Sequence, residues 1–213
     1  AIEKNPTNLD SSLGPADFYF DHNRNPEAMA LLEIAKNKLP LTAKLLTGFA
    51  RGRIERGELA EAKSDLEEAI AKDPAYTHAH YYLGVALYAL GSFDEALQHL
   101  DTVAAENPIS PGLVLHQGLI FEKKGEMDKA LGYYMKALEQ KSDDEGVMLR
   151  AIALYLANDK IDDAQILIDK LLKINPASAE AVYDMGRVEY GRKQFPEALH
   201  TFDKAIKLSP GVG

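Results

Sequence analysis

Residues Thr77–Ser110 read THAHYYLGVALYALGSFDEALQHLDTVAAENPIS, and this stretch decides the fold. Large apolar residues recur at helical spacing in each half, first as Leu83, Leu87 and Leu90 and then as Phe93, Leu97 and Leu100. Between the halves stands Gly91, a residue suited to the left-handed conformation that ends many helices. The stretch therefore predicts two amphipathic helices joined by a tight turn.

The same pattern recurs along the 213-residue chain with a period of 34 residues. Six of the ten prolines fall on one lattice with this spacing, at Pro6, Pro40, Pro74, Pro108, Pro176 and Pro210. Alanine fills a second lattice without exception, at Ala28, Ala62, Ala96, Ala130, Ala164 and Ala198. The residue before a proline is pushed out of the α region, so each lattice proline is expected to end the second helix of a repeat. The small alanines allow the two helices of a repeat to approach closely.

The turn inside each repeat is expected at one fixed position. In five repeats this position holds a residue that tolerates the left-handed conformation, namely Gly57, Gly91, Gly125, Asn23 or Asp159. Lys193 stands at the equivalent position of the last repeat. We therefore expect a less regular turn over residues 192–194.

These residues resemble the tetratricopeptide repeat family, and the resemblance covers nearly the whole chain. In the stretch quoted above, the signature positions hold Leu83, Gly84, Leu87, Gly91, Phe93, Ala96, Leu100 and Pro108. The resemblance implies an all-α, right-handed superhelix of stacked antiparallel hairpins, an α-solenoid, with a concave face lined by the first helices. It places six repeats in a single array over residues 9–213, starting near Leu9, Ala43, Thr77, Pro111, Glu145 and Ala179. Residues 1–8 are then the end of a truncated preceding repeat.

Some residues depart from the family pattern. Gly14 and Pro15 interrupt the opening helix, which we expect to start at Pro15, because proline is tolerated in a first turn. His80 stands where the family has a bulky apolar residue, and Arg53 and Glu189 stand where it has an aromatic or aliphatic one. Local packing at these three positions is expected to differ from that of the family.

The inner surface of such an array is set by the first helix of each repeat. Projected in the stacking register, the middle and far repeats form an apolar, tyrosine-rich trough suited to an amphipathic helix or an extended apolar segment. Its predicted partner-binding residues are Tyr81, Val85, Tyr88, Leu115, Leu119, Leu149, Leu156, Tyr183, Arg187 and Tyr190. The inward residues of the first two repeats include Asp17, Thr47 and Arg51. The alternative is that the apolar residues of the trough only pack between neighbouring repeats.

One subclass of the family grips the C-termini of chaperones with a set pattern of lysine, asparagine and arginine. The equivalent positions of this chain hold Leu13, Asp17, Gly48, His78 and Tyr82. A later register fails as well, because His116 and Arg150 are not accompanied by the required asparagine and lysine. Capture of a chaperone tail is therefore disfavoured.

The chain carries 24 Lys and Arg against 33 Asp and Glu, a net charge of −9 with histidine neutral. This charge repels a phosphate backbone, so nucleic acid is not an expected partner. The third repeat has no Lys or Arg, and acidic residues on or near its second helix predict an acidic outer patch, Asp94, Glu95, Asp101 and Glu106. We expect a solvated surface there, with docking of a basic partner as the alternative.

The sequence contains no pattern typical of catalysis, a cofactor or a metal site. The absence of cysteine excludes disulfides, thiolate metal sites and cysteine nucleophiles. His78 and His80 are close in sequence, but at i and i+2 they point to different sides of a helix. Gly-rich phosphate loops, nucleophile elbows and His-Glu-x-x-His motifs do not occur. We therefore predict a protein that is not an enzyme.

The ends of the sequence suggest incomplete capping. A polar capping helix does not follow the last repeat, so Leu199 and Ile206 are expected to be partly uncovered. We favour a native chain that continues at both ends, with homo-oligomerisation through the uncapped ends as the alternative. The longest apolar run, Ala151–Ala157, is too short to cross a bilayer, so direct membrane insertion is not expected. The compartment stays open between cytoplasm and periplasm.

The sequence thus predicts a non-catalytic scaffold that binds a partner protein, as a peptide or helix, in its concave groove. One alternative is a self-assembling structural scaffold of a larger complex, such as a bacterial secretion, pilus or polysaccharide-export system. The other alternative is an accessory segment of a longer enzyme.

Overall fold

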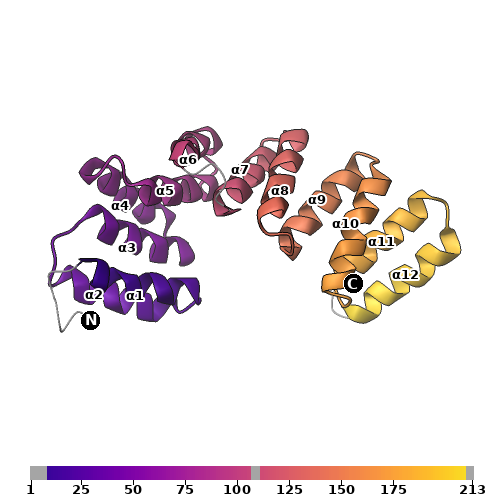
Figure 1. The fold of residues 1–213 in the computed structure, drawn as a ribbon, viewed down its shortest axis with the longest axis horizontal. Helices are drawn as coiled ribbons and strands as arrows, with labels where there is room; N and C mark the ends of the chain where they lie inside the picture. The colour runs from indigo at the N-terminus through magenta and orange to yellow at the C-terminus, as the bar shows by residue number, and fades with distance from the viewer. Residues whose placement is uncertain (1–8, 107–110, 210–213) are drawn as a thin grey trace. The chain divides into compact units, whose positions relative to one another are not determined.

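The structure is a computed structural model that describes residues 9–106 and 111–209. Within those ranges it contains twelve α-helices and no strand, which confirms the expected all-α fold (Figure 1). The helices are α1 (Leu9–Asp21), α2 (Asn25–Lys36), α3 (Ala43–Glu55), α4 (Leu59–Lys72), α5 (Thr77–Ala89), α6 (Phe93–Glu106), α7 (Pro111–Lys123), α8 (Met127–Gln140), α9 (Glu145–Ala157), α10 (Ile161–Ile174), α11 (Ala179–Gly191) and α12 (Phe195–Leu208). Each odd-numbered helix packs in a hairpin with the even-numbered helix that follows it.

Contacts divide the chain into two compact units, unit 1 (Ala1–Pro108) and unit 2 (Ile109–Gly213). In unit 1, α1 contacts α3 and α3 contacts α5, and in unit 2, α9 contacts α11. In unit 1 the helices α1, α3 and α5 thus lie side by side, as do α9 and α11 in unit 2, and the surface that the odd-numbered helices present in each unit is here called the inner face. The single array expected over residues 9–213 stays a prediction, and residues 1–8 lie outside the described residues.

The turns inside the six hairpins share one conformation. The left-handed residue is Asn23, Gly57, Gly91, Gly125, Asp159 or Lys193, with φ between 54° and 82°. Gly57 donates its N–H to the carbonyl of Ile54 at 3.0 Å, and Glu58 donates to the carbonyl of Arg53 at 2.9 Å. These two bonds satisfy carbonyl groups that the helix end would otherwise leave without partners.

The turn at Lys193 corrects one expectation. Lys193 donates its N–H to Tyr190 and Gln194 donates to Glu189, both at 2.9 Å, so this turn repeats the pattern of the glycine turns. The less regular turn expected over residues 192–194 is therefore wrong. The two backbone hydrogen bonds hold the conformation although lysine pays a steric penalty for it.

The first helix corrects a second expectation. It runs through Pro15 from Leu9 to Asp21 and does not start at the proline. A proline inside a helix removes one N–H donor. After the proline, Ala16 and Phe20 are buried in the core of unit 1, and this packing stabilises the part of the helix that follows Pro15.

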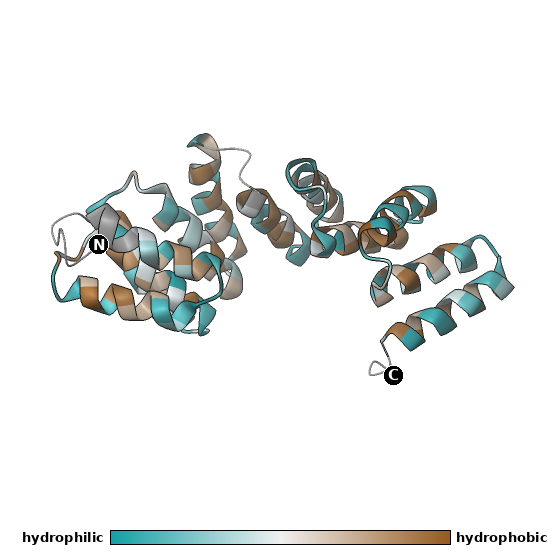
Figure 2. Ribbon diagram, turned by 60° about the horizontal axis from the view of Figure 1, so that its bottom comes forward, coloured by the Kyte–Doolittle hydropathy of each residue, from teal (hydrophilic) through white to brown (hydrophobic). Residues whose placement is uncertain are grey.

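The hairpin seams are tightly packed. The six alanines of the second lattice are at most 1% exposed. A Cβ added to Gly84 would lie 2.7 Å from a side-chain carbon of Leu100 and 3.2 Å from the carbonyl oxygen of Ala96. Apolar and polar residues alternate along the helices in Figure 2, as expected when one side of each helix is buried.

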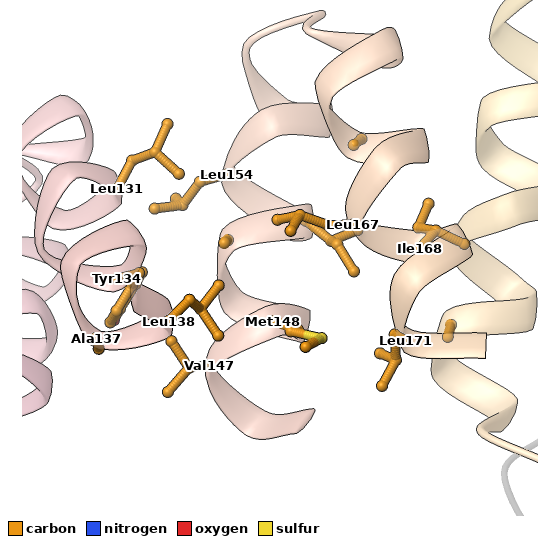
Figure 3. Packing of buried hydrophobic residues seen from close by; sticks show 14 of the residues in the cluster. Leu131, Tyr134, Ala137, Leu138, Val147, Met148, Leu154, Leu167, Ile168 and Leu171 are labelled. Carbon is orange, nitrogen blue, oxygen red and sulfur yellow. The ribbon is translucent and has the colours of Figure 1, made fainter. Parts of the chain in front are cut away.

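Unit 2 has an extended apolar core between α8, α9 and α10 (Figure 3). Tyr134, Met148 and Ile168 are fully buried there, one from each of the three helices. The core of unit 1 around Phe20 also includes Leu32, Leu45 and Phe49. Among the described residues, no helix combines the length and the apolar character that crossing a membrane requires.

The three positions that depart from the family pattern are occupied in different ways. Arg53 forms an ion pair with Asp65 of α4. His80 lies half-buried against α6. The carboxylate oxygen Oε2 of Glu189 is buried and has no hydrogen-bond partner in the described part of the chain.

Candidate functional site

A cavity of about 550 Å³ opens on the inner face of unit 1. It draws its walls from α1, α3 and α5, with one residue of α2 and one that precedes α5. The lining residues are Asp17, Asp21, Leu32, Lys44, Thr47, Gly48, Arg51, Tyr76, His78 and Tyr82. The cavity is therefore a polar site shared by three successive hairpins, and α1, α3 and α5 can be followed in Figure 1.

Arg51 of α3 is held firmly in this cavity. Its Nη2 donates a hydrogen bond to Oδ1 of Asp21 at 2.7 Å. The guanidinium carbon lies 4.8 Å from the ring centre of Phe20 and 5.7 Å from that of Tyr82. An ion pair and two aromatic faces thus compensate the charge of Arg51.

Burial affects three other residues of the cavity. Burial raises the pKa of Asp17, and this effect outweighs the opposite influence of Lys44 and Arg51. Burial also raises the pKa of Tyr82, which keeps its phenol neutral. Thr47 is 4% exposed, and its Oγ1 has no hydrogen-bond partner among the residues that the structure describes.

The inner face of unit 2 has a cavity of about 410 Å³. Arg150 spans one side of it, with Nη1 donating to both carboxylate oxygens of Glu122 at 3.2 Å. The hydroxyl of the buried Tyr134 donates to the same carboxylate. The lining residues are Glu122, Gly146, Leu149, Arg150, Ala153, Leu154 and Glu180.

The last hairpin of unit 2 presents an apolar surface. Leu199 and Ile206 are 65% and 64% exposed, so they are uncovered as expected. Ile206 and Tyr183 border a cavity of about 340 Å³ between α11 and α12. The exposed apolar surface of α12 is here called the α12 end face, defined by Leu199 and Ile206.

Three of the predicted partner-binding residues lie in unit 1. Tyr81, Val85 and Tyr88 are half-buried on α5, and none of them lines the unit 1 cavity. The ring of Tyr81 packs edge-on against Tyr82 with centres 5.2 Å apart, and burial raises the pKa of Tyr81 to about 12. The ring of Tyr88 lies 6.1 Å from that of Phe93.

The other seven predicted residues lie in unit 2. Four of them are leucines that are half-buried against the core of unit 2, namely Leu115, Leu119, Leu149 and Leu156. Leu149 also lines the inner-face cavity of this unit. Tyr183, Arg187 and Tyr190 are exposed on α11, and Arg187 pairs with Asp184 at 2.9 Å. A single binding surface formed by all ten residues stays a prediction.

Several residues of the unit 1 cavity can be found from the sequence, because they occupy the positions that were compared with chaperone-tail capture. Four of the five positions tested for chaperone-tail capture line it, namely Asp17, Gly48, His78 and Tyr82, and Leu13 lies outside the side chains that are described. The inward projection also pointed to Thr47 and Arg51. The predicted trough rests on tyrosine and leucine side chains, so it does not include these polar positions.

A contact between two histidines was missed entirely. Nδ1 of His80 lies 3.0 Å from Nδ1 of His99, and Nε2 of His80 lies 3.1 Å from the carbonyl oxygen of Pro74. A carbonyl only accepts, so His80 donates from Nε2, and His99 donates to its free Nδ1. Spacing within one helix does not reveal this pair, because its members belong to α5 and α6. In the ranges described, no group of three or more metal-ligating side chains occurs.

Family models and curated relatives match this chain. Two models described as tetratricopeptide repeat (TPR) match residues 53–111 in one case and residues 87–145 and 149–212 in the other, and the second covers more than half of the chain. BBSome complex member BBS4 from Bos taurus is 23% identical over 179 residues, which are 83% of this chain and 34% of that protein. The chain thus spans about a third of the length of this relative.

Solved structures resemble the fold. That of pilF from Pseudomonas aeruginosa is 19% identical with a TM-score of 0.79, and the match covers 95% of this chain and 92% of that one. That of YrrB, described as a TPR protein with an unusual peptide-binding site, is 20% identical with a TM-score of 0.71 and covers 85% and 93%. At these identities the likeness is one of fold. From the 34-residue period, the paired helices and the family models we conclude that the chain belongs to the tetratricopeptide repeat family.

Proposed function

We propose that the chain is a non-catalytic protein-interaction module that binds a segment of a partner protein on its inner face. The observation that carries the proposal is the unit 1 cavity, which takes charged and aromatic side chains from three successive first helices. A surface shared by successive repeats suits an elongated ligand such as a peptide. The likeness in fold to YrrB, a TPR protein with a peptide-binding site, supports this proposal.

Exposed tyrosines give unit 2 a candidate binding surface of its own. Tyr183 and Tyr190 are 52% and 62% exposed on α11. Tyrosine offers a large rigid contact area together with a hydroxyl group, and it is enriched at the positions that dominate binding energy. These side chains are therefore available to a partner without a change in the core.

Peptide selection tests the proposal. Short random peptides displayed on phage are selected on the immobilised full chain, and the enriched peptides are titrated by calorimetry. Tyr82→Ala in the unit 1 cavity and Tyr183→Ala in unit 2 are compared separately, and Ile166→Ala serves as a control because Ile166 is exposed on α10. We expect at least one tyrosine variant to weaken binding by about tenfold.

The control keeps the test specific to the inner face. Ile166→Ala is expected to bind like the parent chain, and Tyr183→Ala is expected to keep the parent melting temperature because its side chain is half exposed. A failure to enrich any peptide contradicts the proposal. So does binding that survives both tyrosine changes and is lost in Ile166→Ala.

Self-association is a second candidate function, favoured by the α12 end face. Leu199 and Ile206 place apolar side chains in solvent, and Ile206 borders a cavity, a combination typical of interaction surfaces. Sedimentation velocity over a concentration series is expected to show dimers that Ile206→Asp abolishes. A concentration-independent monomer removes this candidate.

A further inference from the structure

Two imidazole rings meet between the paired helices α5 and α6 of unit 1 (Figure 1). His80 of α5 and His99 of α6 bring their Nδ1 atoms to 3.0 Å, with the ring centres 5.2 Å apart. Both residues are half-buried, so the pair lies at the edge of the core and keeps contact with solvent. Neither residue lines the unit 1 cavity, and the function proposed above does not use them.

The carbonyl of Pro74 fixes the orientation of the His80 ring. Nε2 of His80 donates to this carbonyl at 3.1 Å, so the proton of His80 resides on Nε2 and its Nδ1 presents a lone pair toward His99. Metal-binding histidines commonly have this arrangement, in which one ring nitrogen donates to a carbonyl and the other binds the metal. The fold thus already orients one nitrogen of the pair as a ligand.

The charges around the pair favour a cation. The third repeat, residues 77–110, contains no Lys or Arg. Glu95, one turn before His99 on α6, and Glu67 of α4 both act electrostatically on the His99 ring, and Glu67 also pairs with Lys63 at 3.6 Å. Burial lowers the pKa of His99, so the ring is in the neutral form that binds metals at neutral pH.

We propose that His80 and His99 bind a divalent cation of the Zn²⁺ class through their two Nδ1 atoms, with water in the remaining coordination positions. Imidazole nitrogen is a ligand that Zn²⁺, Cu²⁺ and Ni²⁺ prefer. In the described ranges no third metal-ligating side chain joins the pair, so the protein supplies two ligands. The spacing of histidines within one helix gives no sign of this site, because its two ligands belong to different helices.

The geometry needs only a small adjustment to accept the cation. With Zn–N distances of about 2.0 Å to 2.1 Å, two nitrogens of a tetrahedral site lie about 3.3 Å apart. The observed separation of 3.0 Å between the Nδ1 atoms therefore lengthens slightly. The proton of His99 moves from Nδ1 to Nε2 through solvent, so both Nδ1 atoms offer lone pairs and no proton is released.

Titration of the full chain with ZnCl₂ at neutral pH tests the proposal. Calorimetry is expected to show one Zn²⁺ per chain, and the melting temperature is expected to rise with Zn²⁺ because the cation binds only the folded hairpin. EDTA is expected to reverse the rise. His80→Gln and His99→Gln are each expected to weaken Zn²⁺ binding by about tenfold or more, since each removes one of two protein ligands.

A matched variant and a second cation make the test specific. His200→Gln removes an exposed histidine from α12 and is expected to bind Zn²⁺ like the parent chain. Mg²⁺ prefers oxygen ligands, so it is expected to leave the melting temperature unchanged. The imidazole nitrogen resonances of the parent chain give a readout that does not depend on how any variant folds. Those of His80 and His99 are expected to shift together on addition of Zn²⁺.

Three results would overturn the proposal. The first is a Zn²⁺ affinity that stays the same in His80→Gln and His99→Gln, and the second is a stabilisation that Mg²⁺ produces equally well. The third is a set of imidazole resonances in which Zn²⁺ leaves His80 and His99 unchanged. Peptide selection in the presence of EDTA tests the proposed function separately, so the failure of either proposal is recognised independently of the other.

Discussion

At the scale of the residue, the left-handed position of each hairpin turn shows what backbone hydrogen bonds impose on a side chain. Gly91 adopts the conformation without steric cost, whereas Lys193 adopts it at φ 63° because the same two bonds close its helix. The turn is therefore a property of the hairpin, and the residue type changes only its energy. The less regular turn predicted at Lys193 was wrong because that prediction considered only the residue type.

Replacing Lys193 by glycine tests this explanation. Lys193→Gly is expected to raise the free energy of unfolding by about 0.5 to 1 kcal/mol, because it removes the steric penalty of a positive φ. Gly91→Ala is the matched opposite change and is expected to lower stability by a similar amount. Urea denaturation measures both. A loss of stability in Lys193→Gly would show that its backbone is not strained.

The histidine pair gives the chain a pH dependence. Burial, together with the neighbouring His80, lowers the pKa of His99 below its ordinary value of 6.5, and Glu95 and Glu67 oppose this shift. Burial also lowers the pKa of His116. For both residues, the unfolded chain binds more protons than the folded chain as the pH falls below 6.5. Stability is therefore present above this pH and is lost on acidification.

Thermal unfolding at several pH values measures the effect. Between about pH 7 and pH 5 the melting temperature of the parent chain is expected to fall, and His99→Gln is expected to fall less because one titrating group is gone. His116 keeps part of the dependence in the variant. Identical pH profiles for the two proteins would contradict the assignment to His99.

At the scale of the element, the seam between paired helices is what the sequence predicted best. The alanine lattice and the apolar spacing follow from local rules, and the lattice alanine is buried in each of the six helix pairs described. The helix through Pro15 was not predicted, because the rule for proline is local and takes no account of the burial of Ala16 and Phe20 in the tertiary core. The unit 1 cavity and the contact of His80 with His99 were not predicted, because each brings together residues from different helices. The spacing of residues along one sequence does not give the distances between helices.

A larger side chain in the seam tests the packing. Ala96 is fully buried between α5 and α6, so Ala96→Leu is expected to cost about 1 to 3 kcal/mol through overpacking and to lower the melting temperature. Ala105→Leu makes the same change at an exposed position of α6 and is expected to be nearly neutral. Equal melting temperatures for the two variants would show that the seam lies elsewhere.

At the scale of the whole molecule, stability is built from hairpins that cover their neighbours. The core of unit 2 gathers around α9 and α10, whereas α12 leaves Leu199 and Ile206 in solvent. The repeat period predicts this arrangement within each unit. The division into unit 1 and unit 2 did not follow from it, because a uniform period marks no boundary within the chain.

Hydrogen exchange measures how stability varies along the chain. Amides of α12 are expected to exchange fastest among the helices of unit 2, and those of α9 and α10 slowest, because local opening exposes least apolar surface at the uncovered end. Uniform protection across unit 2 would contradict this expectation. Protection of α12 that rises with protein concentration would instead indicate that a second molecule covers its end face.

The most direct test of the central claim is a map of where a selected peptide binds. Backbone amide chemical shifts of the full chain are recorded with and without the peptide. Binding on the inner face predicts that the largest changes fall on α1, α3 and α5 around the unit 1 cavity, with Thr47 among them. Changes confined to the even-numbered helices or to the α12 end face would contradict it.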